Sequence, residues 1–113
     1  VYKSRELVPR LASLVQTAPD LLGPQYLLAK HTAQSGYAEA ARDGLRLAER
    51  AMETANRLKA EPTNEVSDTR FEWLAMRVAA TCAKHMKIDS RAKKYAEQAL
   101  AIGAPKEAFS EFI

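Results

Sequence analysis

The sequence lacks the cysteines that staple small secreted proteins, because Cys82 is the single cysteine among 113 residues. One cysteine excludes an intrachain disulfide and favours a reducing compartment. The uncharged apolar runs fall well short of the roughly 20 residues that a membrane-crossing helix needs. No secretory signal opens the chain, which is expected to fold in water around one shared core.

An excess of charge of one sign is also lacking, since 17 Lys and Arg stand against 14 Asp and Glu, a net charge of +3. That excess is too small for the clustered basic field of sequence-independent nucleic-acid binding, and a mildly acidic partner is the most that it suggests. The chain begins at Val1 without a methionine. We therefore expect a piece of a longer protein, favour a cytoplasmic location, and leave an upstream anchor or signal open.

Glycine and proline are scarce, with four and five residues, and most of them lie between stretches rich in Ala, Leu, Arg, Glu and Lys. Those stretches favour helix. The pattern predicts six helices, at 4–18, 24–35, 37–60, 68–87, 90–102 and from 105 onward. Residues 61–65 are expected to form a loop, with Ser67 or Asp68 capping the next helix. No alternating pattern predicts a strand, so the expected class is all-α.

The expected helices differ in how much of their surface is apolar. Along 37–60, apolar residues recur at three- and four-residue steps, while the other side carries six charged residues: Arg42, Arg46, Glu49, Arg50, Glu53 and Arg57. That pattern predicts one buried and one exposed face. Along 68–87, apolar residues occupy most of the circumference. This helix is expected to be buried on more than one side.

Small and bulky residues recur at a fixed offset, which is typical of repeated helical hairpins. Each position of the first set has a counterpart 51 positions later, with Ala96 standing where the first set has Leu45: Ala29, Ala41, Leu45 and Ala48, then Ala80, Ala92, Ala96 and Ala99. This order resembles the tetratricopeptide repeat, in which a large and a small residue on a first helix precede a small, a bulky and a small residue on a second. Leu28 and Ala29 match the first pair, and Gly36 matches the turn between the helices.

The resemblance implies a right-handed superhelix of about five or six antiparallel helices in one domain over 1–113. Its parts would be the end helix of a preceding repeat (1–21), a repeat with a lengthened second helix (22–62), a second repeat (68–104) and the start of a further helix (105–113). The repeats are degenerate, because the family's period is about 34 residues and the offset here is 51. Lys87 also replaces the turn glycine, Pro105 falls one residue late, and Trp73 lies early.

The same resemblance implies a non-catalytic scaffold that binds a protein or peptide in a concave groove and helps to assemble a multiprotein complex. Lysine and arginine facing the groove would favour an acidic partner. The first-helix residues that would face the partner are Tyr26, Lys30, Gln34, Arg77, Thr81 and Lys84. Tyr26 and Lys30 stand where some relatives carry a lysine and asparagine clamp for chaperone C-termini, so that special role is not expected.

Two other functions remain open on the sequence. His31 could belong to a helical histidine phosphotransfer module, although Gln34 and Ser35 replace that family's lysine and glycine. A nucleic-acid-binding helical repeat is the second alternative. Cys82 and His85 lie three residues apart, but the apolar surroundings favour a buried, inert cysteine over an activated thiol. The two histidines lack metal-ligand spacing and no glycine-rich phosphate loop occurs, so we expect neither metal nor cofactor and no enzyme activity.

Overall fold

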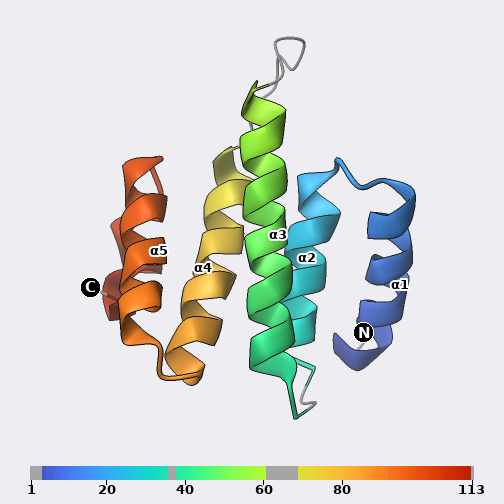
Figure 1. Cartoon of the computed structure of the whole chain (residues 1–113), viewed down its shortest axis with the longest axis horizontal. Helices are drawn as coiled ribbons and strands as arrows, with labels where there is room; N and C mark the ends of the chain where they lie inside the picture. Colours follow the sequence, from blue (N-terminus) through green and yellow to red (C-terminus); the bar gives the residue numbers. More distant parts are fainter. Residues whose placement is uncertain (1–3, 36–37, 61–68, 113) are drawn as a thin grey trace.

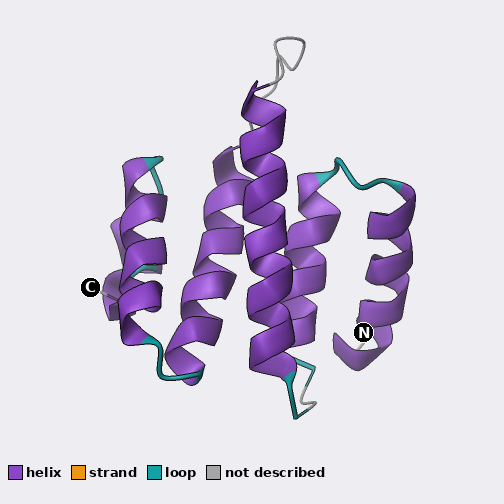
Figure 2. Ribbon diagram, viewed as in Figure 1, coloured by secondary structure: helices purple, strands orange, loops and turns teal. Residues whose placement is uncertain are grey.

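The computed structural model describes residues 4–35, 38–60 and 69–112. It contains five α-helices: α1 (Ser4–Thr17), α2 (Leu22–Ala33), α3 (Ala40–Ala60), α4 (Thr69–His85) and α5 (Asp89–Ala101). They lie side by side in chain order and alternate in direction (Figure 1). The described residues contain helices, loops and turns but no strand (Figure 2), so the all-α prediction is confirmed.

Five of the six predicted helices are present, and their ends fall within three residues of the predicted ones. The predicted long helix is α3, which has 21 residues. The expected turn at Gly36, the loop at 61–65 and the caps at Ser67 or Asp68 lie outside the described residues.

The helices are arranged in two layers. Each helix packs on the next one in the chain, and α2 also packs directly on α4. Helix α3 lies in front of α2 and α4 (Figure 1). Thus α2 and α4 form one layer, while α1, α3 and α5 form the other. Helix α4 contacts α2, α3 and α5, which confirms that it is buried on more than one side.

The core is built mainly from alanines. Ala29 and its counterpart Ala80 are fully buried, as are Ala48 and its counterpart Ala99, and Ala92 is nearly so. Small side chains let helix axes approach closely, since little volume lies between the backbones. The repeated alanines thus lie in the core, with Ala41 partly buried at its edge.

Gly44 makes a close approach of α3 to its neighbours possible. A Cβ atom built at this buried position would lie 2.9 Å from Cβ of Ala33 and 3.0 Å from Sγ of Cys82. Real Cβ atoms essentially never come within 3.0 Å of another heavy atom. Because glycine has no Cβ, α3 can pack against both α2 and α4 at this position.

Helices α4 and α5 end in the same way although their sequences differ. The backbone N–H of Ile88 bonds to the carbonyl of Ala83 at 2.8 Å, and that of Ala104 bonds to Ala99 at 3.1 Å. Each bond spans a residue of positive φ, which is Lys87 at 61° and Gly103 at 98°. This is the Schellman ending, in which glycine is preferred because it has no Cβ. Lys87, the substitute for the expected turn glycine, adopts the glycine conformation.

The prediction of a sixth helix, from 105 onward, is wrong. Two short 3₁₀ turns stand there instead, η1 (Lys106–Ala108) and η2 (Ser110–Phe112). In a 3₁₀ turn, side chains three residues apart lie on one side. Phe109 and Phe112 are both buried, and the ring of Phe109 packs edge-on against Trp73 at a centroid distance of 6.2 Å. These aromatic contacts hold the segment against α4 in a conformation that helical composition does not predict.

A polar contact ties α3 to α5. The Tyr95 hydroxyl donates a hydrogen bond to a carboxylate oxygen of Glu49. Burial, helped by this bond to a negative group, raises the pKa of Tyr95 to about 12. The neutral phenol is therefore the form that the folded chain stabilises.

Candidate partner-binding groove

A groove with a volume of about 420 Å³ lies where α2 and α4 meet. Side chains four residues apart on a helix share one face, so each helix presents a row to this groove. Five of the six residues predicted to face a partner line it: Tyr26, Lys30, Gln34, Arg77 and Thr81. The structure thus brings together two rows that are some 50 positions apart in the chain.

The groove has an apolar floor. Its members are Ala33, Ala41, Leu74, Val78 and Cys82. Leu74 and Val78 were not predicted to line the groove, although Leu74 lies three residues before Arg77 and Val78 lies three residues before Thr81. That helical spacing was the signal that could have identified them.

The Cys82 side chain is only 1% exposed. Burial raises the pKa of its thiol to about 11, so the thiolate that acts as a nucleophile is disfavoured at neutral pH. The prediction of a buried cysteine is confirmed, and His85 stands exposed at the rim of the groove.

The rim combines two cations with neutral polar groups and one carboxylate. Lys30 and Arg77 supply positive charge from opposite walls, and Glu111 supplies the acid at one end. The Thr81 hydroxyl donates a hydrogen bond to the carbonyl of Arg77 at 2.8 Å. The ring of Tyr26 packs against Phe71 at a centroid distance of 6.2 Å, which supports it from within the protein. The groove therefore offers hydrophobic contact flanked by positive charge.

Lys84, the sixth predicted residue, lies apart from this groove. It lines a neighbouring depression of about 400 Å³ together with Lys87 and Phe112. Its ammonium group donates a hydrogen bond to the carbonyl of Glu111 at 3.3 Å and lies 5.6 Å from the centre of the Phe112 ring. The C-terminal turn thus engages Lys84. Because that segment was expected to be helical, neither this contact nor Glu111 was anticipated.

His31 lies on α2 and is half-buried, outside the lining of the groove. Its pKa is lowered from the usual value by burial and by the adjacent positive charge of Lys30. Both effects favour the neutral imidazole. The residues that replace the phosphotransfer family's lysine and glycine follow at the end of α2, where Gln34 is exposed and Ser35 is buried.

Residues 4–35, 38–60 and 69–112 contain neither a metal site nor a membrane-spanning helix. In those parts, no group of three or more His, Cys, Asp or Glu residues is placed to hold a metal ion. None of the helices described there combines the length and apolar character needed to cross a membrane.

Comparisons with models of known protein families, with curated proteins and with solved structures give no match to this chain.

Proposed function

We propose that this chain is a non-catalytic protein-binding scaffold of the tetratricopeptide type, which holds an acidic segment of a partner in the groove between α2 and α4. The observation that carries the proposal is the convergence of Tyr26, Lys30 and Gln34 with Arg77 and Thr81 on one groove. These residues belong to the two first helices of the repeat register. A scaffold of this kind would serve the assembly of a multiprotein complex.

The arrangement of the helices supports the repeat interpretation. Alternating helices stack in two layers, and α2 packs on α4 as first helices of neighbouring hairpins would. Ala29 and Ala80, at equivalent positions of the repeat register, are both fully buried. We propose that further hairpins stacked on these would form a right-handed superhelix, as the resemblance to the tetratricopeptide family implies.

The chemistry of the groove supports an acidic peptide as its ligand. Its volume of about 420 Å³ is within the roughly 300–1,000 Å³ of typical ligand sites. Leu74 and Val78 can accept an apolar side chain of the partner. Lys30 and Arg77 stand on either side, where charge-assisted hydrogen bonds to a carboxylate can form. An extended or helical segment with one apolar anchor and nearby Asp or Glu satisfies both features.

Charge reversal of the two groove cations tests the proposal. Proteins cross-linked to the parent chain in a lysate would be identified and compared with those recovered by the Lys30→Glu/Arg77→Glu variant. The matched control is Lys93→Glu/Lys94→Glu, which makes the same change in charge at exposed positions of α5. We expect partners shared by parent and control to be lost from the groove variant. Equal recovery by all three proteins would refute the groove assignment.

The affinity of a recovered segment then gives a quantitative test. A synthetic peptide of that segment should bind the groove variant at least about tenfold more weakly than the parent, as expected for loss of charged contacts. Replacing Asp and Glu of the peptide by Asn and Gln should have a similar effect. A peptide that binds all variants equally would show that its site lies elsewhere.

A further inference from the structure

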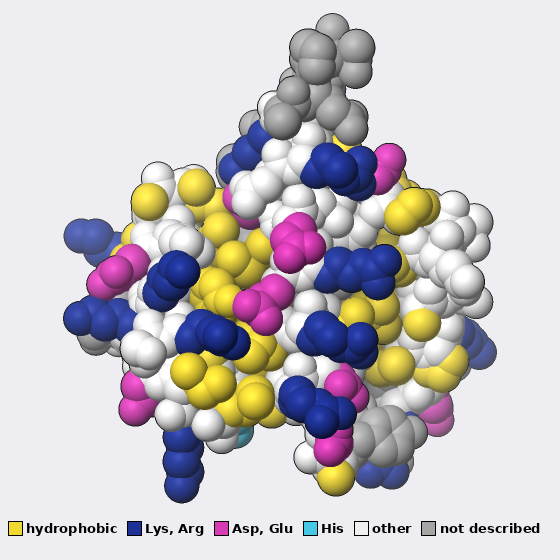
Figure 3. Space-filling view, in the orientation of Figure 1, with side chains coloured by type: hydrophobic (Ala, Val, Ile, Leu, Met, Phe, Trp, Pro, Cys, Tyr) yellow, Lys and Arg dark blue, Asp and Glu magenta, His cyan; other side chains and the backbone are white. Residues whose placement is uncertain are grey.

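A second groove lies on the other layer of the molecule, between α1 and α3. Its volume is about 470 Å³, and α2 forms its base. Val15 of α1, Leu28 of α2 and Leu47 of α3 line it, with Leu28 buried and the other two half-buried. Figure 3 shows hydrophobic surface on both sides of the central helix α3, and a row of basic side chains borders the part on the α1 side. The groove is thus apolar at its base and positively charged along one wall.

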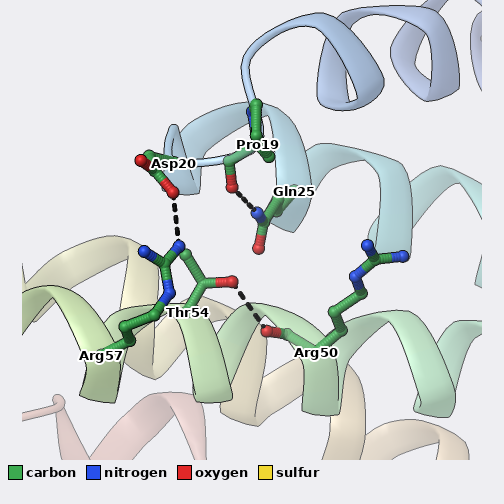
Figure 4. A network of polar contacts seen from close by, with 6 residues as sticks. All are labelled: Pro19, Asp20, Gln25, Arg50, Thr54 and Arg57. Atoms are coloured by element: carbon green, nitrogen blue, oxygen red, sulfur yellow. Dashed lines mark hydrogen bonds and ion pairs between the residues drawn. The ribbon is translucent and has the colours of Figure 1, made fainter.

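The positively charged wall is the exposed face of α3, which carries four arginines at helical spacing: Arg42, Arg46, Arg50 and Arg57. The two outer ones have carboxylate partners in the chain. Arg57 forms an ion pair with Asp20 in the connection before α2 (Figure 4). Arg42 forms one with Glu39. Their charges are therefore compensated within the protein.

The two inner arginines are differently placed. Arg46 reaches only Asp43, at 4.0 Å, and Arg42 shares that carboxylate at 3.8 Å. Arg50 forms no ion pair with any residue that the structure describes, and its side chain extends from α3 toward α2 (Figure 4). Both arginines line the groove. An anionic partner could pair with them without displacing a strong internal contact.

We propose that this second groove binds an acidic amphipathic helix of a partner protein. The apolar stripe of such a helix would rest on Val15, Leu28 and Leu47. Carboxylates four residues apart on its border would pair with Arg46 and Arg50, which have the same one-turn spacing of roughly 6 Å. Arginine suits this role because its planar guanidinium binds a carboxylate through two parallel hydrogen bonds.

The apolar base distinguishes this ligand from a polyanion. A nucleic-acid backbone would use the arginines and leave Val15 and Leu47 uncovered, whereas an amphipathic helix covers both. The net charge of the chain, +3, also gives no broad basic surface. The surface is separate from the groove between α2 and α4, so one binding event can occur without the other.

A display selection tests this inference directly. The probe is a library of 18-residue helical peptides, randomised along one face, selected on the immobilised parent chain. We expect enriched peptides to carry Asp or Glu at positions four apart beside an apolar stripe. Their affinities, measured by fluorescence polarisation, should fall at least about tenfold in Arg46→Glu/Arg50→Glu, as loss of paired charges predicts. Lys93→Glu/Lys94→Glu and Lys30→Glu/Arg77→Glu should retain binding, the latter because it alters only the other groove.

Circular dichroism would verify that each variant is folded, and Arg46→Gln/Arg50→Gln replaces the reversal variant if it is not. Methyl NMR signals of Val15 and Leu47 should shift when an enriched peptide is added. Failure to enrich any peptide, enrichment without acidic residues, or equal binding to the arginine variants would overturn the inference. Tighter binding of a heparin fragment or a single-stranded oligonucleotide through the same arginines would also overturn it, since the groove would then serve a polyanion.

Discussion

Alanine at position 44 would place a methyl group where three helices meet. Two opposing effects follow from this substitution. Replacing a glycine within a helix by alanine usually stabilises the helix by about 1 kcal/mol. The new methyl group, however, would stand 2.9 Å from Cβ of Ala33 and 3.0 Å from Sγ of Cys82. Ala33 has no side-chain torsion that could relieve this contact, and Cys82 is buried, so its sulfur has little room to move.

The net effect is expected to be destabilising. Inserting a methyl group into a well-packed core typically costs about 1–3 kcal/mol. After the gain in helix propensity, Gly44→Ala should lower the free energy of unfolding by about 1 kcal/mol. Gly23→Ala is the matched control, because its Cβ would meet the Phe71 ring at an ordinary distance of 3.4 Å. That variant should be as stable as the parent or more stable.

Urea titration followed by circular dichroism would measure both variants, with the midpoint and slope fitted to a two-state transition. A further variant, Gly44→Ala/Cys82→Ala, removes the sulfur from the contact. Its loss of stability should be smaller than the sum of the two single losses, because the shared contact is relieved. If Gly44→Ala proves as stable as Gly23→Ala, the close approach of α3 to α2 and α4 is not as described.

Other predictions concern the helix ends and two buried groups. Lys87→Gly should raise the free energy of unfolding by about 1 kcal/mol, because it removes a Cβ from a left-handed residue. Gly103→Ala should lower the free energy of unfolding by about as much, because it adds a Cβ at such a residue. Urea titrations in which Lys87→Gly is destabilising or Gly103→Ala is stabilising would contradict this. Cys82 should react with an aromatic disulfide reagent at pH 8 at least about a hundredfold more slowly in the folded chain than in urea, given the rise of its pKa from 9.0 to about 11; equal rates would show an accessible thiol. For Tyr95, whose pKa is raised to about 12, the folded state holds the proton more tightly than the unfolded state. The free energy of unfolding should therefore fall as pH rises from about 10 to about 12. The free energy of unfolding of the Tyr95→Phe variant should fall less over that range.

Helix positions could be predicted from the sequence because local signals set them. Runs of good helix formers define the five helices, and four-residue spacing defines their faces. The same spacing placed Lys30 and Arg77 on facing rows, which is why most of the groove was identified. These features depend on neighbours within one or two helical turns.

Features that depend on distant contacts were not predictable in this way. The C-terminal turns form because Phe109 packs on Trp73, far away in the chain. Lys84 was assigned to the groove by spacing alone, whereas its hydrogen bond to Glu111 places it beside the C-terminal turn. The role of Gly44 requires knowledge of how α3 approaches two other helices. Periodicity carries no information on such contacts.

The alanine core also affects how the protein can vary. Nearly every substitution at Ala29, Ala79 or Ala80, all without exposed surface, must enlarge the side chain. Large core residues such as leucine can be trimmed or exchanged for others of similar volume, but alanine leaves only glycine as a smaller choice. A saturation scan of single mutants should therefore find its most intolerant positions at the smallest core residues rather than the largest. Variation in such a protein would be confined to its exposed faces, where new partners can be acquired without disturbing the spacing of the helices.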